Sequence, residues 1–364
     1  MIEYGNFNYY PKLTSKPAEI KGLLHLPDLV KNKILPTFVL GKWMSSQDVV
    51  KPYEAFIKAF GNNRNFILDI TDKTDRQSDG SKELDNPEGD FKAWRAYVES
   101  LESSVIPAVQ ASPQATLRNV VRQAIKLESF FGALAFNIDI FDSSTIDKQL
   151  AALSALDEPS NSIIQLDYGY ITQSSFTGIR SRVIEVINDV RRIDPTLEIV
   201  VTGSSFPRSA AEYGDSQGAI PILERELFLQ IGGDNVAIYG DHASIHPKAP
   251  TPGIMRFVPR VDYATPDNWI YRRRKAEGDN KSAYIECAKS IIESEEWDDG
   301  LNVWGANEIR RVANGDTDKM LSPQNWIAVR VNLHIYQQTL STASLSEYDD
   351  DFEYEAMDEW DELF

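Results

Sequence analysis

Residues 163–190 read IIQLDYGYITQSSFTGIRSRVIEVINDV, and this stretch joins two different periodicities. Its first part, Ile163 to Tyr168, alternates apolar and polar side chains, as a β-strand with two different faces does. Its second part repeats apolar residues at helical spacing, at Ile179, Val183, Val186, Ile187 and Val190. The stretch therefore reads as one strand followed by one helix.

The same strand–helix unit recurs eight times between Tyr9 and Ala243. We expect strands over residues 9–13, 34–40, 66–70, 105–109, 134–140, 163–168, 198–202 and 236–239. Eight such units close a parallel barrel, whereas a doubly wound open sheet usually has about five to seven strands. The sequence predicts an α/β fold, a (β/α)8 barrel of the TIM type, with its site at the C-terminal ends of the strands.

The repeat ends after Pro247, and the rest of the chain divides into two parts. Over residues 247–340 we expect an α/β extension that packs on the barrel of residues 1–246 and supplies its eighth helix. This extension should hold an edge strand at Trp269–Tyr271 and helices over residues 282–295 and 325–337. Residues 341–364 form an acidic tail that is predicted to be disordered when free.

Composition narrows the class of protein. Apolar residues make up 42% and charged residues 25% of the 364 positions, ordinary values for a globular protein. The only cysteine, Cys287, excludes an internal disulfide and favours a reducing compartment. The N-terminus lacks the features of a signal peptide, and the longest apolar runs, such as Ile34–Leu40, are too short to span a bilayer. We therefore expect a cytoplasmic protein with no membrane contact.

A polar insertion, Thr71 to Gly89, follows the third expected strand and so lies on the face where a barrel carries its site. It is rich in Asp, Ser and Gly. Either it is a lid over the site, or it is an ordinary surface loop, which such compositions form more often.

Strand parity indicates which polar side chains share the barrel lumen. Alternate residues of a barrel strand point to the lumen and to the surrounding helices. Polar residues alternate with apolar ones in three strands, at Asp69 and Thr71, at Asn137 and Asp139, and at Gln165 and Asp167. Thr202 and Ser204 follow the same rule, and either Asp241 or His242 reaches the rim, depending on register.

These strands offer four carboxylates to one mouth: Asp69, Asp139, Asp167 and Asp241. Together with His242 they are the candidate catalytic residues, because carboxylates in different environments divide into an acid and a base. The same four are candidate ligands for Mg²⁺ or Mn²⁺, which prefer oxygen. Alternatively, each Asp caps a helix or holds a loop. Four histidines in the whole chain are too few to favour a multi-histidine zinc centre.

Two segments are candidate anion sites. The first follows the seventh strand and offers Ser204, Ser205 and Arg208, with a tight turn as the alternative. The second is the basic run Arg272-Arg273-Arg274-Lys275, which could contact nucleic-acid phosphates, form a solvated face, or receive the chain's own acidic tail.

Several short motifs resemble those of the phage-type "beta protein" family. They include YPKL at residues 10–13, LDYGY at 166–170, SFPR at 205–208 and YGDH at 239–242. The resemblance extends from about residue 9 to residue 337. It implies a TIM-barrel-like protein of phages, prophages and bacterial conflict loci, and it brings no reaction with it. The tail lies outside the family pattern.

The tail holds more than half of the excess negative charge. Ser341–Phe364 contains ten acidic residues and no basic one, so the chain's charge of −18 falls to −8 over the first 340 residues. Phe352, Tyr354, Trp360 and Phe364 lie among the acids and are candidate partner-binding residues.

Two functions follow. The first is a binding or inhibitory protein whose tail docks on a basic, nuclease-like or nucleic-acid-handling partner, in part as a nucleic-acid mimic. The second is a divalent-metal-dependent hydrolase or phosphodiesterase with its site at the C-terminal face of the barrel. A third hypothesis is that the tail only keeps the protein soluble.

Overall fold

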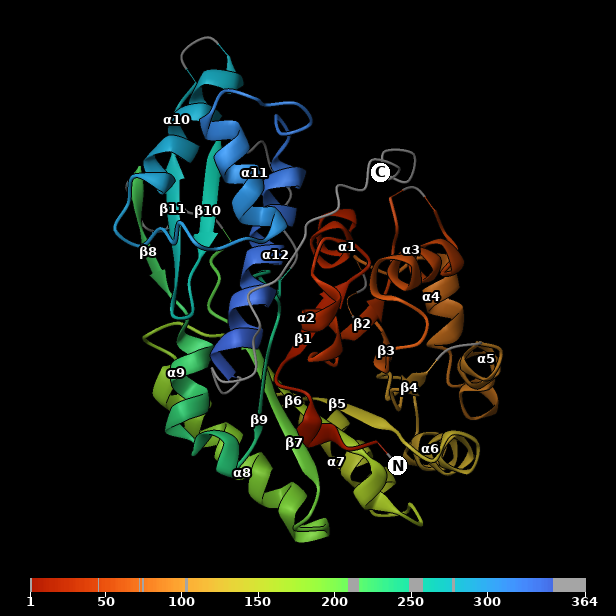
Figure 1. The fold of residues 1–364 in the computed structure, drawn as a ribbon. Coiled ribbons are helices and arrows are strands. Elements are labelled where there is room, and N and C mark those ends of the chain that lie inside the picture. Colours follow the sequence, from red (N-terminus) through yellow and green to blue (C-terminus); the bar gives the residue numbers. More distant parts are fainter. Residues whose placement is uncertain are drawn as a thin grey trace.

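The computed structural model describes residues 2–44, 46–71, 73, 75–101, 104–208, 216–248, 258–276 and 279–342. Its centre is a sheet of eight parallel strands in the order β4-β3-β2-β1-β9-β7-β6-β5. The outer strands β4 and β5 meet through a parallel bridge between Ala108 and Ala135, so the sheet is nearly closed into a barrel (Figure 1). The predicted barrel architecture is confirmed.

The elements follow the predicted order along the chain. The barrel strands are β1 (Tyr10–Thr14), β2 (Thr37–Leu40), β3 (Phe66–Ile70), β4 (Val105–Pro107), β5 (Ala135–Asp139), β6 (Ile163–Tyr170), β7 (Glu198–Ser204) and β9 (Ile238–Asp241). The helices around them are α1 (Pro17–Leu24), α2 (Asp28–Asn32), α3 (Val50–Phe60), α4 (Asp79–Leu84), α5 (Glu88–Glu99), α6 (Leu117–Phe131), α7 (Ser143–Leu153), α8 (Phe176–Ile193) and α9 (Leu223–Gln230). Their apolar stripes face the sheet because burial of those side chains drives the packing.

The lumen is filled at its N-terminal end by apolar side chains from most of the strands. This cluster consists of Tyr4, Tyr10, Leu35, Ile67, Ile106, Ala108, Ala135, Ile163 and Val200. Residues two positions further along a strand point the same way. Lys12, Asp69, Asn137 and Asp167 therefore lie above this cluster, toward the C-terminal mouth of the barrel.

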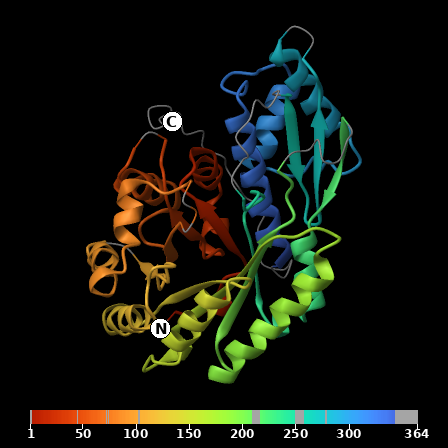
Figure 2. The ribbon, with the colours of Figure 1, turned by 180° about the vertical axis from the view of Figure 1, so that it is seen from behind.

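A second, antiparallel sheet stands beside the barrel, as the two opposite views agree (Figures 1 and 2). It consists of β8 (Gln217–Pro221), β10 (Arg260–Ala264) and β11 (Asn268–Arg273), with β11 in the middle. Helices α10 (Asn280–Ile292) and α11 (Trp304–Ala313) complete a separate apolar core around Trp269 and Tyr284.

The expected strand at residues 269–271 exists as part of β11, but its expected place at an edge is wrong. β8 lies inside the segment assigned to the barrel and pairs with β11 on its free side. Nothing local predicts β8, because its sequence QGAIP contains Gly and Pro, which disfavour strands. Its pairing is decided by the tertiary structure.

The last described helix, α12 (Pro323–Thr342), joins the two cores. Its Val331 and Ile335 belong to the barrel core, whereas Val329 and Leu333 belong to the core of the second sheet. It packs closely on α1, since a Cβ atom at Gly22 would lie 2.8 Å from the carbonyl oxygen of Ala328. α12 therefore takes the place of the barrel's eighth helix.

The insertion after β3 contains regular structure in its described part. Ser78 caps helix α4, and the side chains of Ser78 and Ser81 each bond the backbone of the other at the helix start. Backbone N–H of Lys42 donates to the carbonyl oxygen of Arg76 at 2.7 Å, which ties the insertion to the loop after β2. The proposed lid role stays a prediction.

Candidate functional site

A charged cluster occupies the mouth of the barrel, at the C-terminal ends of β1, β6 and β9. Asp167 accepts hydrogen bonds from Lys12 Nζ at 2.8 Å and from His242 Nε2 at 3.1 Å. The backbone N–H of Gly169 also donates to this carboxylate, at 2.8 Å. The side chains of Lys12, Asp167 and His242 are at most 19% exposed. The mouth thus holds a compact, largely desolvated ion cluster.

The protonation state of Asp167 follows from these neighbours. Burial alone would raise its pKa, but His242 and Lys12 beside it outweigh burial and hold the pKa well below its usual range. Because an ionised carboxylate can only accept, Nε2 of His242 carries the proton in this bond. Asp167 is therefore an anchored anion at neutral pH.

A second carboxylate, Asp69, lies in the same lumen with amide partners. Its oxygens accept hydrogen bonds from Gln110 Nε2 at 2.9 Å and from Asn137 Nδ2 at 2.7 Å. Burial raises the pKa of Asp69, and the attraction of Lys12 only partly offsets it. The mouth therefore contains two carboxyl groups whose environments shift their pKa values in opposite directions, a pattern that separates an acid from a base.

Asp139 lies at the rim of the same mouth. Its Cα is paired with that of Asp167 in the parallel register of β5 and β6. The residue is exposed, and its Oδ1 accepts the backbone N–H of Phe141 at 2.9 Å. Asp139 is thus the most solvent-accessible of the predicted carboxylates.

Asp241 lies apart from the mouth, contrary to the expected convergence of four carboxylates. It points outward from β9, where it is fully buried and accepts hydrogen bonds from Tyr239 Oη at 2.9 Å and His334 Nε2 at 2.7 Å. The hydroxyl of Tyr9 donates to its other oxygen. The physical reason is strand parity: His242 takes the lumen position, so its neighbour faces α12.

The geometry does not assemble the expected metal site. In the described part of the chain, no group of three or more His, Cys, Asp or Glu side chains is placed to hold a metal ion. Asp167 is already paired with a lysine and a histidine, and Asp241 lies on the other face of its strand. The predicted Mg²⁺ or Mn²⁺ ligands therefore do not form one oxygen-rich set.

The first predicted anion site, after β7, is occupied by the protein's own groups. Ser204 Oγ accepts the backbone N–H of Phe206 at 3.1 Å. Ser205 donates from its backbone N–H, at 2.9 Å, and from its hydroxyl to the buried carboxyl of Glu224 on α9. Burial, followed by the charge of Asp241, raises the pKa of Glu224 to about 8. Arg208 is the last residue of the described range 104–208.

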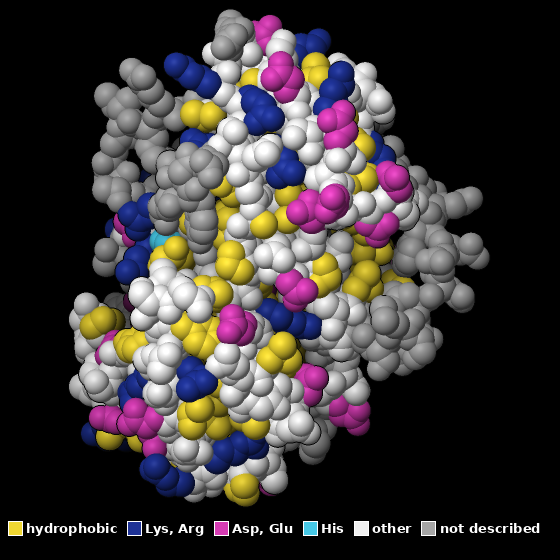
Figure 3. Space-filling model, turned by 90° about the vertical axis from the view of Figure 1, so that its left-hand side faces the viewer, with side chains coloured by type: hydrophobic (Ala, Val, Ile, Leu, Met, Phe, Trp, Pro, Cys, Tyr) yellow, Lys and Arg dark blue, Asp and Glu magenta, His cyan; other side chains and the backbone are white. Residues whose placement is uncertain are grey.

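The second predicted anion site lies on the other sheet, away from the barrel mouth. Arg272 and Arg273 end β11, and Arg274 follows them. Arg272 donates from Nε to Ser290 Oγ at 3.1 Å and from Nη1 to the Tyr271 carbonyl oxygen at 3.0 Å. Figure 3 shows Lys and Arg side chains interspersed with Asp and Glu on this side of the molecule. The arginines and the serines after β7 do not form a common cradle.

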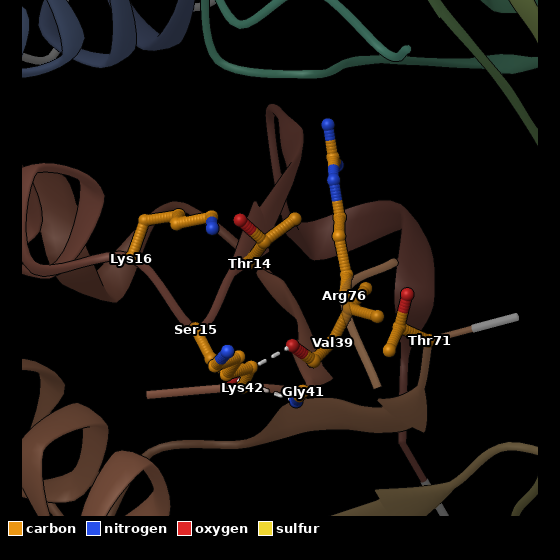
Figure 4. Close-up of a pocket in the computed structure, with 8 residues that line it drawn as sticks. All are labelled: Thr14, Ser15, Lys16, Val39, Gly41, Lys42, Thr71 and Arg76. Carbon is orange, nitrogen blue, oxygen red and sulfur yellow. Dashed lines mark hydrogen bonds between the residues drawn. The ribbon is translucent and has the colours of Figure 1, made fainter. Parts of the chain in front are cut away.

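A shallow basic pocket, which sequence reasoning missed, adjoins the mouth at the ends of β1, β2 and β3 (Figure 4). Its lining residues are Thr14, Ser15, Lys16, Val39, Gly41, Lys42, Thr71 and Arg76. Within the described residues, no acidic side chain forms an ion pair with Lys16, Lys42 or Arg76. The cavity itself has a volume of about 10 Å³, room for roughly one water molecule.

Ser15 has a different role from the one its sequence position suggests. A serine just before a helix commonly caps it, but here Lys16 is the N-cap residue of α1 and makes no side-chain cap bond. Ser15 Oγ instead donates to the Val39 carbonyl oxygen at 3.1 Å and accepts the Gly41 N–H at 2.9 Å, as the dashed lines of Figure 4 show. It thereby holds the ends of β1 and β2 together under the basic pocket.

Comparison with known proteins places this architecture in a family. A family model described as "Beta protein" matches residues 9–339. The chain belongs to the Beta protein family. Protein beta of Enterobacteria phage P4 is similar to it, with 39% identity over 356 residues that cover 97% of this chain and 99% of the phage protein. No solved structure matches the chain. The resemblance inferred from the sequence motifs is confirmed.

The family description states no reaction and no partner, so the roles of the site residues stay proposals. The predicted partner-binding residues Phe352, Tyr354, Trp360 and Phe364 lie outside the described residues. No helix in the described ranges is both long enough and apolar enough to cross a membrane.

Lys12 and Glu224 were missed for different reasons. Lys12 lies two residues after Tyr10 in β1, so both side chains point into the lumen. The alternation that placed Asp69 and Asp167 in the lumen therefore also predicts Lys12 there. Glu224 carried no signal, because an acid in the first turn of a helix is usually a solvated, dipole-stabilising residue.

Proposed function

We propose that this member of the Beta protein family is a cytoplasmic binding or inhibitory protein of phage–host conflict. In this proposal the barrel and the second sheet form a scaffold, and the segment Ser341–Phe364 docks on a partner with a basic surface. The observation that supports it most is the charge of this segment, which starts at the C-terminal end of α12 and holds ten acidic residues and no basic one.

The start of the segment is fixed on the scaffold. Arg225 Nη2, on α9, donates to the carbonyl oxygen of Ser341 at 2.9 Å. An acidic segment anchored at one end raises the rate of encounter with a basic surface through long-range attraction. Aromatic side chains such as Trp360 then provide apolar contact area, the usual source of strong binding at interfaces. Proteins that handle nucleic acid are the partner class with such basic surfaces.

Docking within the same chain, on Arg272–Lys275, is the less favoured arrangement. The guanidinium of Arg272 already donates to Ser290 and to the Tyr271 carbonyl oxygen. Arg274 Nη1 donates to the Arg273 carbonyl oxygen at 2.9 Å. These arginines have fewer free donors for an acidic segment than an unoccupied basic groove on a partner would offer.

Co-purification from the native host tests the proposal. The full chain is compared with a variant that carries Asp358→Asn, Glu359→Gln, Asp361→Asn and Glu362→Gln, and both proteins and nucleic acids in the eluate are identified. We expect a host protein with a basic surface to be retained by the wild type and lost from the variant. Equal retention of every partner by both chains would reject the docking role of the segment.

A second candidate function, a hydrolase or phosphodiesterase at the barrel mouth, is favoured by one observation. Asp69, with its raised pKa, and the anionic Asp167 lie in one lumen beside Lys12, next to a pocket with three basic side chains. Such a mouth can accept an anionic substrate, with Asp69 as proton donor. The described residues provide no set of metal ligands, so no metal-dependent step is assigned.

Hydrolysis of bis(p-nitrophenyl) phosphate tests this second function. The wild type, Asp69→Asn and Lys12→Met are assayed with Mg²⁺, with Mn²⁺ and with a chelator. Activity that falls at least tenfold in both variants supports the mouth as a catalytic site. Absence of turnover in the wild type under all three conditions, or unchanged activity in the variants, counts against it.

A further inference from the structure

A cavity lies away from the barrel mouth, where β10, α10 and α12 meet. Its volume is about 160 Å³. Its lining residues are Val258, Arg260, Asp262, Tyr284, Pro323, Trp326, Ile327 and Arg330. Neither the proposed partner docking nor the barrel mouth uses any of them.

Two arginines in this cavity share one carboxylate. Arg260 Nε donates to Asp262 Oδ1 at 2.5 Å, and Arg330 Nη1 donates to Asp262 Oδ2 at 2.9 Å. Both oxygens of Asp262 are thereby engaged, and the cluster keeps a surplus of one positive charge. Arg330 is only 7% exposed. A buried guanidinium without a full counter-charge is costly, so the cavity favours an anion.

The other groups near the arginines do not supply that anion. Arg330 lies 3.9 Å from the ring centroid of Phe206, and Arg260 lies 5.3 Å from it, which gives a cation–π contact but no counter-charge. Glu19 is the other carboxyl group that acts on Arg330. Its oxygens bond to Thr14, and burial raises its pKa, which weakens it as a counter-charge.

Unused donors remain on both guanidinium groups. Arg330 donates from Nε to Ser244 Oγ at 3.3 Å and from Nη1 to Asp262. Its third nitrogen, Nη2, is not used in either bond. Arg260 uses Nε, and its Nη2 is buried with no hydrogen-bond partner in the described part of the chain. A carboxylate accepts such paired N–H donors well, because its two oxygens match the fork geometry of arginine.

The rest of the cavity is aromatic and apolar. The rings of Tyr284 and Trp326 stack with centroids 5.3 Å apart and planes 20° apart. Trp326 Nε1 donates to the Met320 carbonyl oxygen at 2.8 Å, which fixes the indole. Pro323 is exposed and Ile327 half-buried, so the cavity opens to solvent beside them. An engineered cavity of about 150 Å³ in another protein binds benzene, so this one has room for a single aromatic ring.

We propose that this cavity is a binding site for an aromatic carboxylate, with the carboxylate on Arg260 and Arg330 and the ring against Trp326 and Tyr284. Two sources have this chemistry: a free aromatic acid of the cell, and the C-terminal aromatic residue of a polypeptide.

Titration of the full chain with 4-fluorobenzoate, followed by ¹⁹F NMR, tests the site. Saturable binding is expected, and neutral 4-fluorobenzamide should bind at least tenfold more weakly. Arg260→Met should weaken 4-fluorobenzoate binding at least tenfold while leaving Asp262 paired with Arg330. Ile327→Trp, which fills the opening and keeps both arginines, should do the same. Arg272→Met, an arginine of the neighbouring strand outside the cavity, is the matched control and should change the affinity less than twofold.

Competition separates the two sources. A peptide of residues 355–364 with a free C-terminal carboxylate should displace 4-fluorobenzoate if a polypeptide terminus is the ligand, and the same peptide with a C-terminal amide should not. If only free aromatic acids displace it, the ligand is a small molecule, and the site stands. The proposal is overturned if 4-fluorobenzoate shows no saturable binding, or if Arg260→Met and Ile327→Trp bind it as the wild type does. Neither of these two overturning results affects the separate proposal that the acidic segment docks on a host partner.

Discussion

His334 Nε2 donates a hydrogen bond of 2.7 Å to Asp241 Oδ2 between the barrel and α12, where neither side chain is exposed. Nδ1 of the same imidazole accepts from Trp269 Nε1 at 3.1 Å. Because an indole N–H can only donate, His334 is the neutral tautomer with its proton on Nε2. One imidazole thus connects β9 of the barrel with β11 of the second sheet.

His334→Ala should destabilise the protein by about 3 kcal/mol, because it removes one donor from a buried carboxylate, leaves a buried indole N–H without its acceptor and creates a cavity between the two cores. The measurement is the free energy of unfolding in urea. His242→Ala is the control, because Asp167 keeps its hydrogen bonds from Lys12 and from the Gly169 N–H, and it should lose only about 1 kcal/mol. Equal losses in the two variants would contradict the assigned role of His334.

Glu224→Gln should make stability less dependent on pH. Burial, together with Asp241, raises the pKa of Glu224 to about 8 in the folded protein, against about 4.3 in an unfolded chain. The protonated carboxyl therefore favours the fold fully below the unfolded value, and this contribution is lost as the pH rises through the folded value. Between about pH 5 and pH 8 the wild type should lose on the order of 3 kcal/mol more than the variant.

Urea unfolding of both chains at a series of pH values measures this difference. The remaining titratable groups are common to the two proteins, so the difference between the curves isolates Glu224. Parallel curves would show that Glu224 titrates in the folded protein as it does in the unfolded chain.

Gly22→Ala should separate α1 from α12. An added Cβ would lie 2.8 Å from the Ala328 carbonyl oxygen and 2.9 Å from Val331 Cβ, so the helices must move apart, at a loss of about 2 kcal/mol. Gly178→Ala, in α8, is the matched control. A Cβ there meets no atom within 4 Å, and the change should gain about 0.5 kcal/mol from helix propensity. Thermal unfolding of both variants shows whether each change lowers or raises the melting temperature. A Gly22→Ala protein as stable as the wild type would refute the close packing of α1 on α12.

Local periodicity predicted the barrel because each strand–helix unit contains, within its own stretch of sequence, the pattern of a strand followed by the pattern of a helix. Residues 66–70 were expected and found as β3, and parity placed Asp69 and Asp167 in the lumen. Parity alone could not choose between Asp241 and His242 at the rim, because the partner that holds Asp241 comes from a helix 93 residues later. β8 was missed because its strand character exists only through pairing with β11.

The two-arginine cavity was also beyond sequence reasoning. Arg260 and Arg330 lie far apart in the chain and meet only because α12 packs against β10. A local sequence pattern does not indicate which distant residues come into contact. The charge of residues 341–364, in contrast, follows directly from their sequence. The sequence therefore favoured partner binding, and the structure added Lys12 to the predicted mouth residues and revealed the cavity.

In the proposed function, residues 341–364 carry the contact with a basic partner. The most direct test is displacement of host proteins from the immobilised full chain by a synthetic peptide of residues 341–364, with a peptide in which every Asp and Glu is replaced by Asn and Gln as the control. We predict that the acidic peptide elutes a basic partner and the neutral one does not. A partner that stays bound at saturating acidic peptide would show that residues 341–364 do not carry the contact.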